Sequence, residues 1–212
     1  MKHFFALFIL LFSNWATAET FTTVEAYLEH LTNGQPIVSS SFEFSRSGNV
    51  FGAVQWRIPA NISDEMSPYL ASVFILEKLK NNNFKEVIRS IPSGGFSGGN
   101  LQVLDGVEIK SDSSFSVNLH NFVPLGVITY RFALIDQSWR FSGRDEHFCF
   151  YDKEDEDGCG IEEKRSINFL TGNAIEDKFR SDNLISTKNS KTKFPDFPLN
   201  EFKFFDEKYE PL

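Results

Sequence analysis

The segment Gly95-Phe96-Ser97-Gly98-Gly99 fits the G-x-S-x-G pattern of the nucleophile elbow in α/β-hydrolases. In that motif the glycines allow a strained turn between a strand and a helix, and the turn exposes the serine. His120 and His147 lie downstream and are the residues that would serve as the base. However, residues 100–103 have a strand pattern where the motif requires a helix. We therefore favour a glycine-rich turn into the main sheet. A serine hydrolase that uses Ser97 with His120 or His147 is the alternative.

An acidic loop contains Asp152, Asp155 and Asp157, and two glutamates lie between them. Carboxylates at this density could bind Ca²⁺. The spacing does not match an EF-hand, because Lys153 stands where that motif needs an acid. Charge runs usually face water, so we favour a solvated loop and expect neither a metal nor another cofactor.

Two cysteines, Cys149 and Cys159, flank this loop. An even pair in an exported protein suggests a disulfide, which constrains the unfolded chain. Zinc is disfavoured, because two cysteines without a second pair of ligands do not complete a tetrahedral site. We predict a disulfide between Cys149 and Cys159.

Residues 1–18 are typical of a secretory signal peptide. A basic start is followed by an apolar run over residues 4–12 and by Ala16 and Ala18, which match the A-x-A cleavage rule. The apolar run is too short to span a bilayer, which needs about 20 residues. The alternative is an N-terminal membrane anchor. We predict cleavage after Ala18, an exported protein in the periplasm or the medium, and no membrane span in the mature chain.

The composition restricts the partners. The 212 residues carry a formal charge of −8, whereas a nucleic-acid partner or an anionic lipid surface would require a basic face. Phe is abundant, with 24 residues, and most of those in the mature chain are expected in the core. An apolar ligand pocket is the less favoured explanation. We expect no nucleic acid, and an unknown protein or an apolar small molecule as the partner.

The first mature element is predicted to be an amphipathic helix. Thr22 and Glu25 fit a capping box, the apolar residues that follow recur at helical spacing, and Asn33-Gly34 favours a left-handed end. We expect the apolar face of this helix to pack on the sheet.

The next segments are predicted from alternation and turn residues. Residues 37–44 and 50–58 alternate around a glycine-containing turn and indicate a hairpin. Ser67-Pro68 favours a helix over residues 69–80, although Val73-Phe74-Ile75 favours a strand. Residues 84–91 are predicted to form a strand.

Residues 101–150 contain five short apolar-alternating runs separated by turn residues, the last two around Trp139 and Phe148. This pattern predicts a mainly β (α+β) fold. The fold would be an antiparallel meander in a barrel- or sandwich-like sheet, with the N-terminal helix packed on it. We expect a single β-rich domain over residues 19–178. Residues 179–212 are predicted to form an extended tail whose aromatic residues fold back on the domain or bind a partner.

The helix and strand over residues 20–44 and the meander over 98–142 resemble the VirK family of exported, virulence-associated bacterial proteins. Two features depart from the family pattern. Ser39-Ser40-Ser41 contains no cysteine, whereas the family commonly has one in this strand. The segment over residues 45–97 is also longer than in the family core. The resemblance implies an exported, host-associated protein of unassigned activity and gives no residue a catalytic role.

We therefore predict a non-enzymatic binding or interaction protein. The histidines lie too far apart in the sequence to suggest a metal-binding motif. The hydrolase alternative would require Ser97 to lie within hydrogen-bond distance of a histidine.

Overall fold

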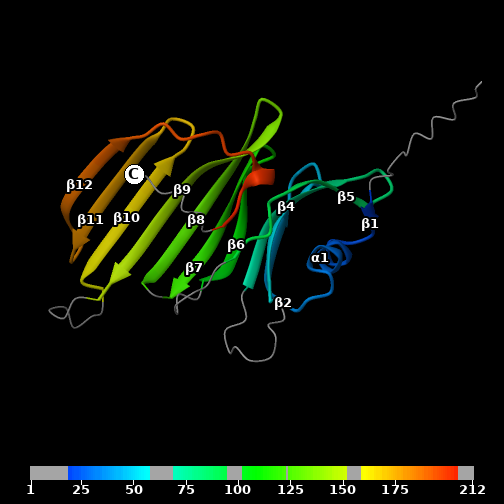
Figure 1. Cartoon of the computed structure of the whole chain (residues 1–212), viewed down its shortest axis with the longest axis horizontal. Helices are drawn as coiled ribbons and strands as arrows, with labels where there is room; N and C mark the ends of the chain where they lie inside the picture. The colour runs from blue at the N-terminus through cyan, green and yellow to red at the C-terminus, as the bar shows by residue number, and fades with distance from the viewer. Residues whose placement is uncertain (1–18, 58–68, 95–101, 123, 152–158, 205–212) are drawn as a thin grey trace, which may run out of the picture.

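In the computed structural model the chain forms two antiparallel β-sheets and one short α-helix, α1 (Val24–Thr32) (Figure 1). The structure describes residues 19–57, 69–94, 102–122, 124–151 and 159–204. The predicted signal peptide over residues 1–18 lies outside these ranges. No helix within them is long and apolar enough to cross a membrane.

The smaller sheet has five strands in the order β1-β5-β4-β3-β2. Its strands are β1 (Thr20–Phe21), β2 (Ile37–Phe44), β3 (Val50–Arg57), β4 (Tyr69–Lys78) and β5 (Phe84–Arg89). The predicted hairpin is confirmed, since β2 and β3 pair antiparallel across a turn that contains Gly48 at φ 86°.

The larger sheet has seven strands that follow one another along the chain, as a meander. Its strands are β6 (Gln102–Ser111), β7 (Ser114–Phe122), β8 (Leu125–Ile135), β9 (Ser138–Phe150), β10 (Ile161–Asn168), β11 (Asn173–Arg180) and β12 (Asn183–Lys191). Two of its hairpins turn on consecutive residues with positive φ, Asp136-Gln137 and Ser181-Asp182. This is the conformation that suits a two-residue turn between twisted strands.

The predicted mainly β fold is confirmed, but neither sheet closes into a barrel among the described strands. Each sheet keeps two different end strands, β1 and β2 in one and β12 and β6 in the other (Figure 1).

The main hydrophobic core draws on both sheets. Phe51, Val73 and Ile75 of the smaller sheet belong to the same buried cluster as Phe115 and Phe132 of the larger one. The phenylalanine rings pack on one another, with the centroids of Phe115 and Phe132 5.0 Å apart. Ring-on-ring packing accounts for these phenylalanines without an apolar ligand.

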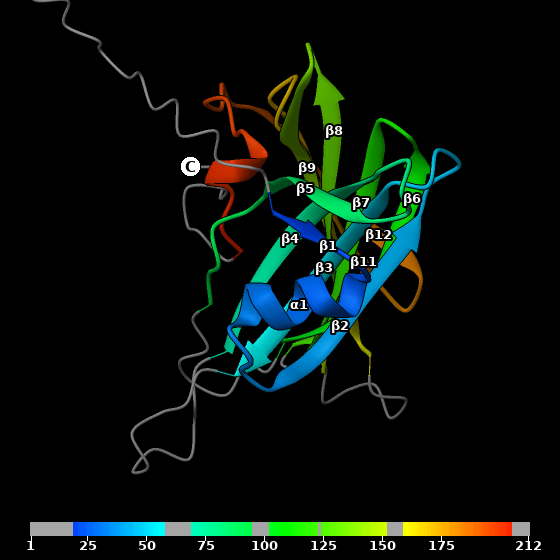
Figure 2. The ribbon, with the colours of Figure 1, turned by 90° about the vertical axis from the view of Figure 1, so that its right-hand side faces the viewer.

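Helix α1 contributes to a second buried cluster on the other side of β3 and β4. Tyr27 and Leu28 share this cluster with Val54, Trp56 and Phe74, and Figure 2 shows α1 beside these strands. Thr23 is the N-cap rather than Thr22, since its hydroxyl accepts from the Ala26 backbone N–H at 3.1 Å. The helix ends at Asn33 in the left-handed conformation, as predicted.

The helix predicted over residues 69–80 is wrong, because this segment is strand β4. Its residues from Ala71 to Leu76 are all buried, with Val73 and Ile75 in one core cluster and Phe74 and Leu76 in the other. A β-branched and aromatic run that is buried on both faces suits a central strand, and this packing outweighs the local helix-start signal.

The prediction of five short runs is also wrong in one place, because the fourth and fifth belong to a single strand, β9. The polar stretch between Phe141 and Phe148 continues the pairing with β8 and β10. Arg144 and Glu146 are buried in this stretch and form an ion pair, and Arg165 also contacts Glu146. Because the buried charges are compensated, the strand continues although these positions are not apolar.

The segment predicted to be an extended tail differs from that expectation. It includes strand β12, and beyond it lies the short 3₁₀ helix η1 (Leu199–Glu201). Phe197, Leu199, Phe202 and Phe204 are buried in the main core, where the rings of Phe202 and Phe141 lie 4.8 Å apart. These aromatic residues therefore fold back on the domain, the first of the two predicted alternatives, and cover apolar surface of the large sheet.

The outer edge of β6 is covered by side chains from the smaller sheet. The N–H groups of Leu104, Val107 and Ile109 donate to Gln55, Ser41 and Glu43, at 3.3, 3.0 and 3.0 Å. The Ser39 hydroxyl donates to the Leu104 carbonyl at 2.9 Å. Backbone groups that would be free at a sheet edge are thus satisfied within the molecule.

Candidate functional site

The residues considered for catalysis are not brought together in the described part of the chain. Ser97 lies outside the described residues. His120 on β7 and His147 on β9 both pair with Val127 of β8, which separates them by two strand spacings, or about 10 Å. His120 packs on Phe122, with ring centroids 5.2 Å apart. The two histidines are therefore alternatives at separate places on the sheet.

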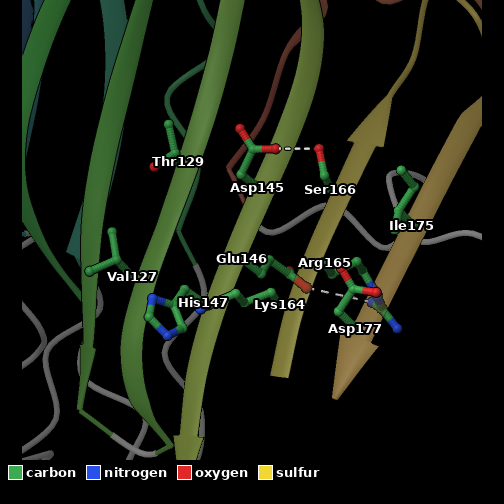
Figure 3. A pocket seen from close by; sticks show the side chains of 10 residues that line it. All are labelled: Val127, Thr129, Asp145, Glu146, His147, Lys164, Arg165, Ser166, Ile175 and Asp177. Atoms are coloured by element: carbon green, nitrogen blue, oxygen red, sulfur yellow. Dashed lines mark hydrogen bonds and ion pairs between the residues drawn. The ribbon is translucent and has the colours of Figure 1, made fainter. Parts of the chain in front are cut away.

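His147 instead contributes to a pocket of about 490 Å³ on the face of the large sheet that points away from the core. We call it the outer-face pocket (Figure 3). Four neighbouring strands, β8 to β11, supply its lining: Val127, Thr129, Asp145, Glu146, His147, Lys164, Arg165, Ser166, Ile175 and Asp177. Its volume lies in the range of small-molecule sites, about 300–1,000 Å³.

Strand alternation explains why polar side chains gather on this face. Along β8, Ile128, Tyr130 and Phe132 are buried in the core, so Val127 and Thr129 between them face outward. The pairing places Asp145 beside Thr129 and Ser166 beside Asp145, which makes one row across three strands.

Hydrogen bonds hold the polar row in a defined arrangement. The Ser166 hydroxyl donates to Asp145 Oδ1 at 2.6 Å, and Arg131 Nε lies 3.0 Å from Asp145 Oδ2. Thr129 donates to Asn118 Oδ1 at 2.8 Å. These contacts thus hold the polar side chains of the outer face in position without a bound ligand.

Gly143 is needed for this arrangement. A Cβ at this position would lie 2.5 Å from Arg131 Nη2 and 2.7 Å from the Ile167 carbonyl oxygen. Because glycine leaves this space open, Arg131 crosses over β9 and donates to the Ile167 carbonyl at 2.9 Å. The close approach of the arginine therefore depends on the missing side chain.

A second group of charges borders the pocket at Glu162. His147 and Lys164 both contact the Glu162 carboxylate, the lysine at 3.2 Å. Burial opposes ionisation of Glu162, but hydrogen bonds from Lys164 and His147 outweigh it and hold the pKa of this carboxyl below its usual range. Lys164 Nζ also lies 4.8 Å from the ring centroid of Phe179.

Behind the pocket, the inner face of the same strands carries a buried ionic cluster. Arg144 binds Glu146 through two guanidinium nitrogens, and Arg165 Nη1 lies 3.6 Å from the second carboxylate oxygen of Glu146. Arg165 also donates to Glu176 at 3.3 Å. Glu146 and Arg165, which also line the pocket, are therefore held in place by ion pairs on the inner face of the sheet (Figure 3).

The serine and the histidine that line the pocket bind different partners. An activated serine needs a general base as its hydrogen-bond partner, most often a histidine, but Ser166 donates to Asp145, and His147 contacts Glu162. Asp145 and Glu146 are paired with arginines, whereas Asp177 accepts from the Thr187 hydroxyl, so the surface offers both charged and polar contacts to a ligand. Val127 and Ile175 supply the apolar contacts.

The predicted disulfide between Cys149 and Cys159 is confirmed, and it links the end of β9 to the start of β10. The proposed Ca²⁺ ligands Asp152, Asp155 and Asp157 lie outside the described residues. Within the described ranges, no group of three His, Cys, Asp or Glu side chains is arranged to hold a metal ion.

Sequence reasoning missed most of the pocket, including Asp145, Lys164, Ser166 and Asp177. The sequence pattern predicts two separate runs around Trp139 and Phe148, and Asp145 lies in the polar stretch between them. One signal was present in the sequence. The polar stretch between Phe141 and Phe148 contains no second glycine and no proline, so its composition is compatible with one continuous strand.

Comparison of the chain with protein-family models, with curated proteins and with solved structures gives no match. The resemblance to the VirK family therefore stays a prediction.

Proposed function

We propose that this chain is an exported, non-enzymatic binding protein whose ligand docks on the outer face of the seven-stranded sheet, over the outer-face pocket. The observation that carries the proposal is the pocket on β8 to β11, in which neighbouring strands already hold the polar side chains in place. Preorganised side chains favour binding, because less conformational entropy is lost when the ligand arrives.

Export is supported by the disulfide between Cys149 and Cys159. Disulfides persist in oxidising compartments and are rare in the cytosol. The signal-peptide pattern of residues 1–18 points in the same direction. In line with the VirK-like pattern, we propose that the protein acts in the periplasm or outside the cell and in association with a host.

A protein partner fits the outer face better than an apolar small molecule. The lining mixes charged, hydroxyl and aliphatic side chains, so a ligand must match charged groups as well as apolar ones. The phenylalanine rings that could line such a cavity pack on one another in the core. The partner is therefore expected to present both charged and aliphatic groups.

We also propose a sandwich-like arrangement with α1 as a permanent cover of the smaller sheet. Support comes from the core cluster that both sheets share and from the second cluster, in which Tyr27 and Leu28 meet residues of β3 and β4. In this arrangement the apolar face of α1 packs on the smaller sheet of the same domain and does not bind a partner. The outer face of the large sheet then serves as the binding surface.

Site-specific photo-crosslinking tests the proposal. A photoreactive amino acid replaces Val127 in the pocket or, as a matched control, the exposed Val87 on β5 of the other sheet. We expect an adduct from the exported fraction at position 127 that is absent at position 87. Equal labelling at both positions, or none at 127, would contradict an outer-face site.

A further inference from the structure

Strand β12 forms one edge of the seven-stranded sheet and is exposed along its whole length. It pairs with β11 on one side only. Leu184 and Ile185, at a bulge near its start, are each 57% exposed. Such an edge is a template for a further strand, because its outward backbone donors and acceptors have no partner among the described strands.

The other sheet edges in the described part of the chain differ from β12. The edge of β6 is covered by Ser41, Glu43 and Gln55, and β2 supplies two of these side chains. β2, the long end strand of the smaller sheet, contacts β6 through Ser39 and Ser41, and the other end strand, β1, has only two residues. β12, with nine residues, is therefore the long uncovered edge among the described strands.

The backbone groups that point outward can be assigned from the ladder. The Thr192 N–H donates to the Gly172 carbonyl at 2.8 Å, which makes this a hydrogen-bonded pair in register with the β11–β12 pairing. Hydrogen-bonded and non-hydrogen-bonded pairs alternate along an antiparallel ladder. Ser190 and Lys188 therefore bond toward β11, whereas the backbone groups of Asn189 and Thr187 face the open edge.

The charge of this edge indicates what kind of strand fits it. Residues 183–193 carry Lys188, Lys191 and Lys193 and no acidic residue, in a chain of formal charge −8. Glu176, which pairs with Lys188 across the ladder, is already engaged by Arg165 and Lys178. A second copy of this chain would bring two basic edges together. An acidic strand instead meets opposite charge at the contact.

We propose that β12 accepts an extended, acidic segment of a partner protein as an additional strand of the sheet. The backbone groups of Thr187, Asn189 and Lys191 would form the ladder, and Lys188 and Lys191 would pair with acidic side chains on either face of the added strand. This edge site is separate from the outer-face pocket and does not depend on it.

The test is a titration of the full mature chain, followed by NMR, with a blocked eight-residue peptide of Thr and Val that carries two Glu three residues apart. We expect the amide signals of β12 to shift and those of β6 to remain. The variant Asn189→Pro removes an outward N–H while sparing the bonds to β11, so its Kd should rise about tenfold. Its thermal midpoint should stay close to that of the wild type, because no ladder bond is lost.

Two control peptides leave the protein unchanged. A peptide with N-methyl groups on alternate residues cannot form the ladder, and a peptide with Lys in place of Glu cannot form the ion pairs. Both should bind at least about tenfold more weakly. Absence of binding by the original peptide, or binding that survives N-methylation and Asn189→Pro, would overturn the proposal. A concentration-dependent dimer that Asn189→Pro abolishes would overturn it in favour of a second copy.

Discussion

Arg144 and Glu146 are ionisable residues on the inner face of β9, and each is only 7% exposed. Burial of one such charge alone would be very unfavourable. The two residues compensate each other, and Arg165 provides a second cation for the same carboxylate. A carboxylate shared by two arginines is the kind of contact whose loss is costly, because both arginines lose an ionic partner in a mostly buried position.

We expect Glu146→Gln to lower the free energy of unfolding by about 3–5 kcal/mol, since it leaves Arg144 and Arg165 without their shared partner. The control is Glu108→Gln, which removes an exposed carboxylate paired with Lys110 and should cost at most about 1 kcal/mol. Urea denaturation of both variants measures the difference. Equal losses would show that the buried cluster contributes no more than a surface ion pair.

Glu162, at the border of the pocket, makes the stability of the fold depend on pH. Its folded-state pKa is lowered, so the ionised carboxylate stabilises the fold above the unfolded-state pKa, about 4.3. This stabilisation is lost as the pH falls through the folded-state pKa. We expect Glu162→Gln to be less stable than the wild type at pH 7, and the deficit to disappear at strongly acidic pH. A deficit in the thermal midpoint that is independent of pH would contradict this cause.

At the scale of elements, the contact between β2 and β6 shows how a sheet edge is satisfied by side chains. We expect Ser41→Ala to destabilise the protein by about 1–3 kcal/mol, because the Val107 N–H loses its acceptor in a partly buried position. Ser40→Ala, at the neighbouring exposed position, is the matched control. Hydrogen exchange at the Val107 amide should accelerate only in Ser41→Ala; unchanged exchange there would exclude this contact as the cover of β6.

The sequence predicted those elements whose signals are local. Asn33 ends α1, and the alternation along β7 and β8 agrees with the side chains that these strands bury in the core. β4 was missed because its strand character comes from burial on both faces, which is a property of the assembled layers. The pocket was missed because its polar residues depend on pairing across four strands, and no single segment reveals this pairing.

At the scale of the whole molecule, the disulfide joins the two strands that lie at the centre of the pocket. We expect the double variant Cys149→Ser/Cys159→Ser to lose about 3 kcal/mol of unfolding free energy, since the short loop is no longer closed in the unfolded chain. Chemical denaturation with and without reductant checks this. The reductant should weaken the wild type and leave the double variant unchanged, and a wild type insensitive to reductant would contradict the expected contribution.

The outer-face site can be tested by native mass spectrometry of the protein purified from its own exported fraction. Val127→Trp fills the pocket without removing a polar contact, and Val87→Trp introduces the same side chain on the other sheet. We predict a co-purifying component on the wild type and on Val87→Trp that is missing from Val127→Trp. A bare polypeptide in all three samples, or a component that all three retain, would contradict binding at the outer face.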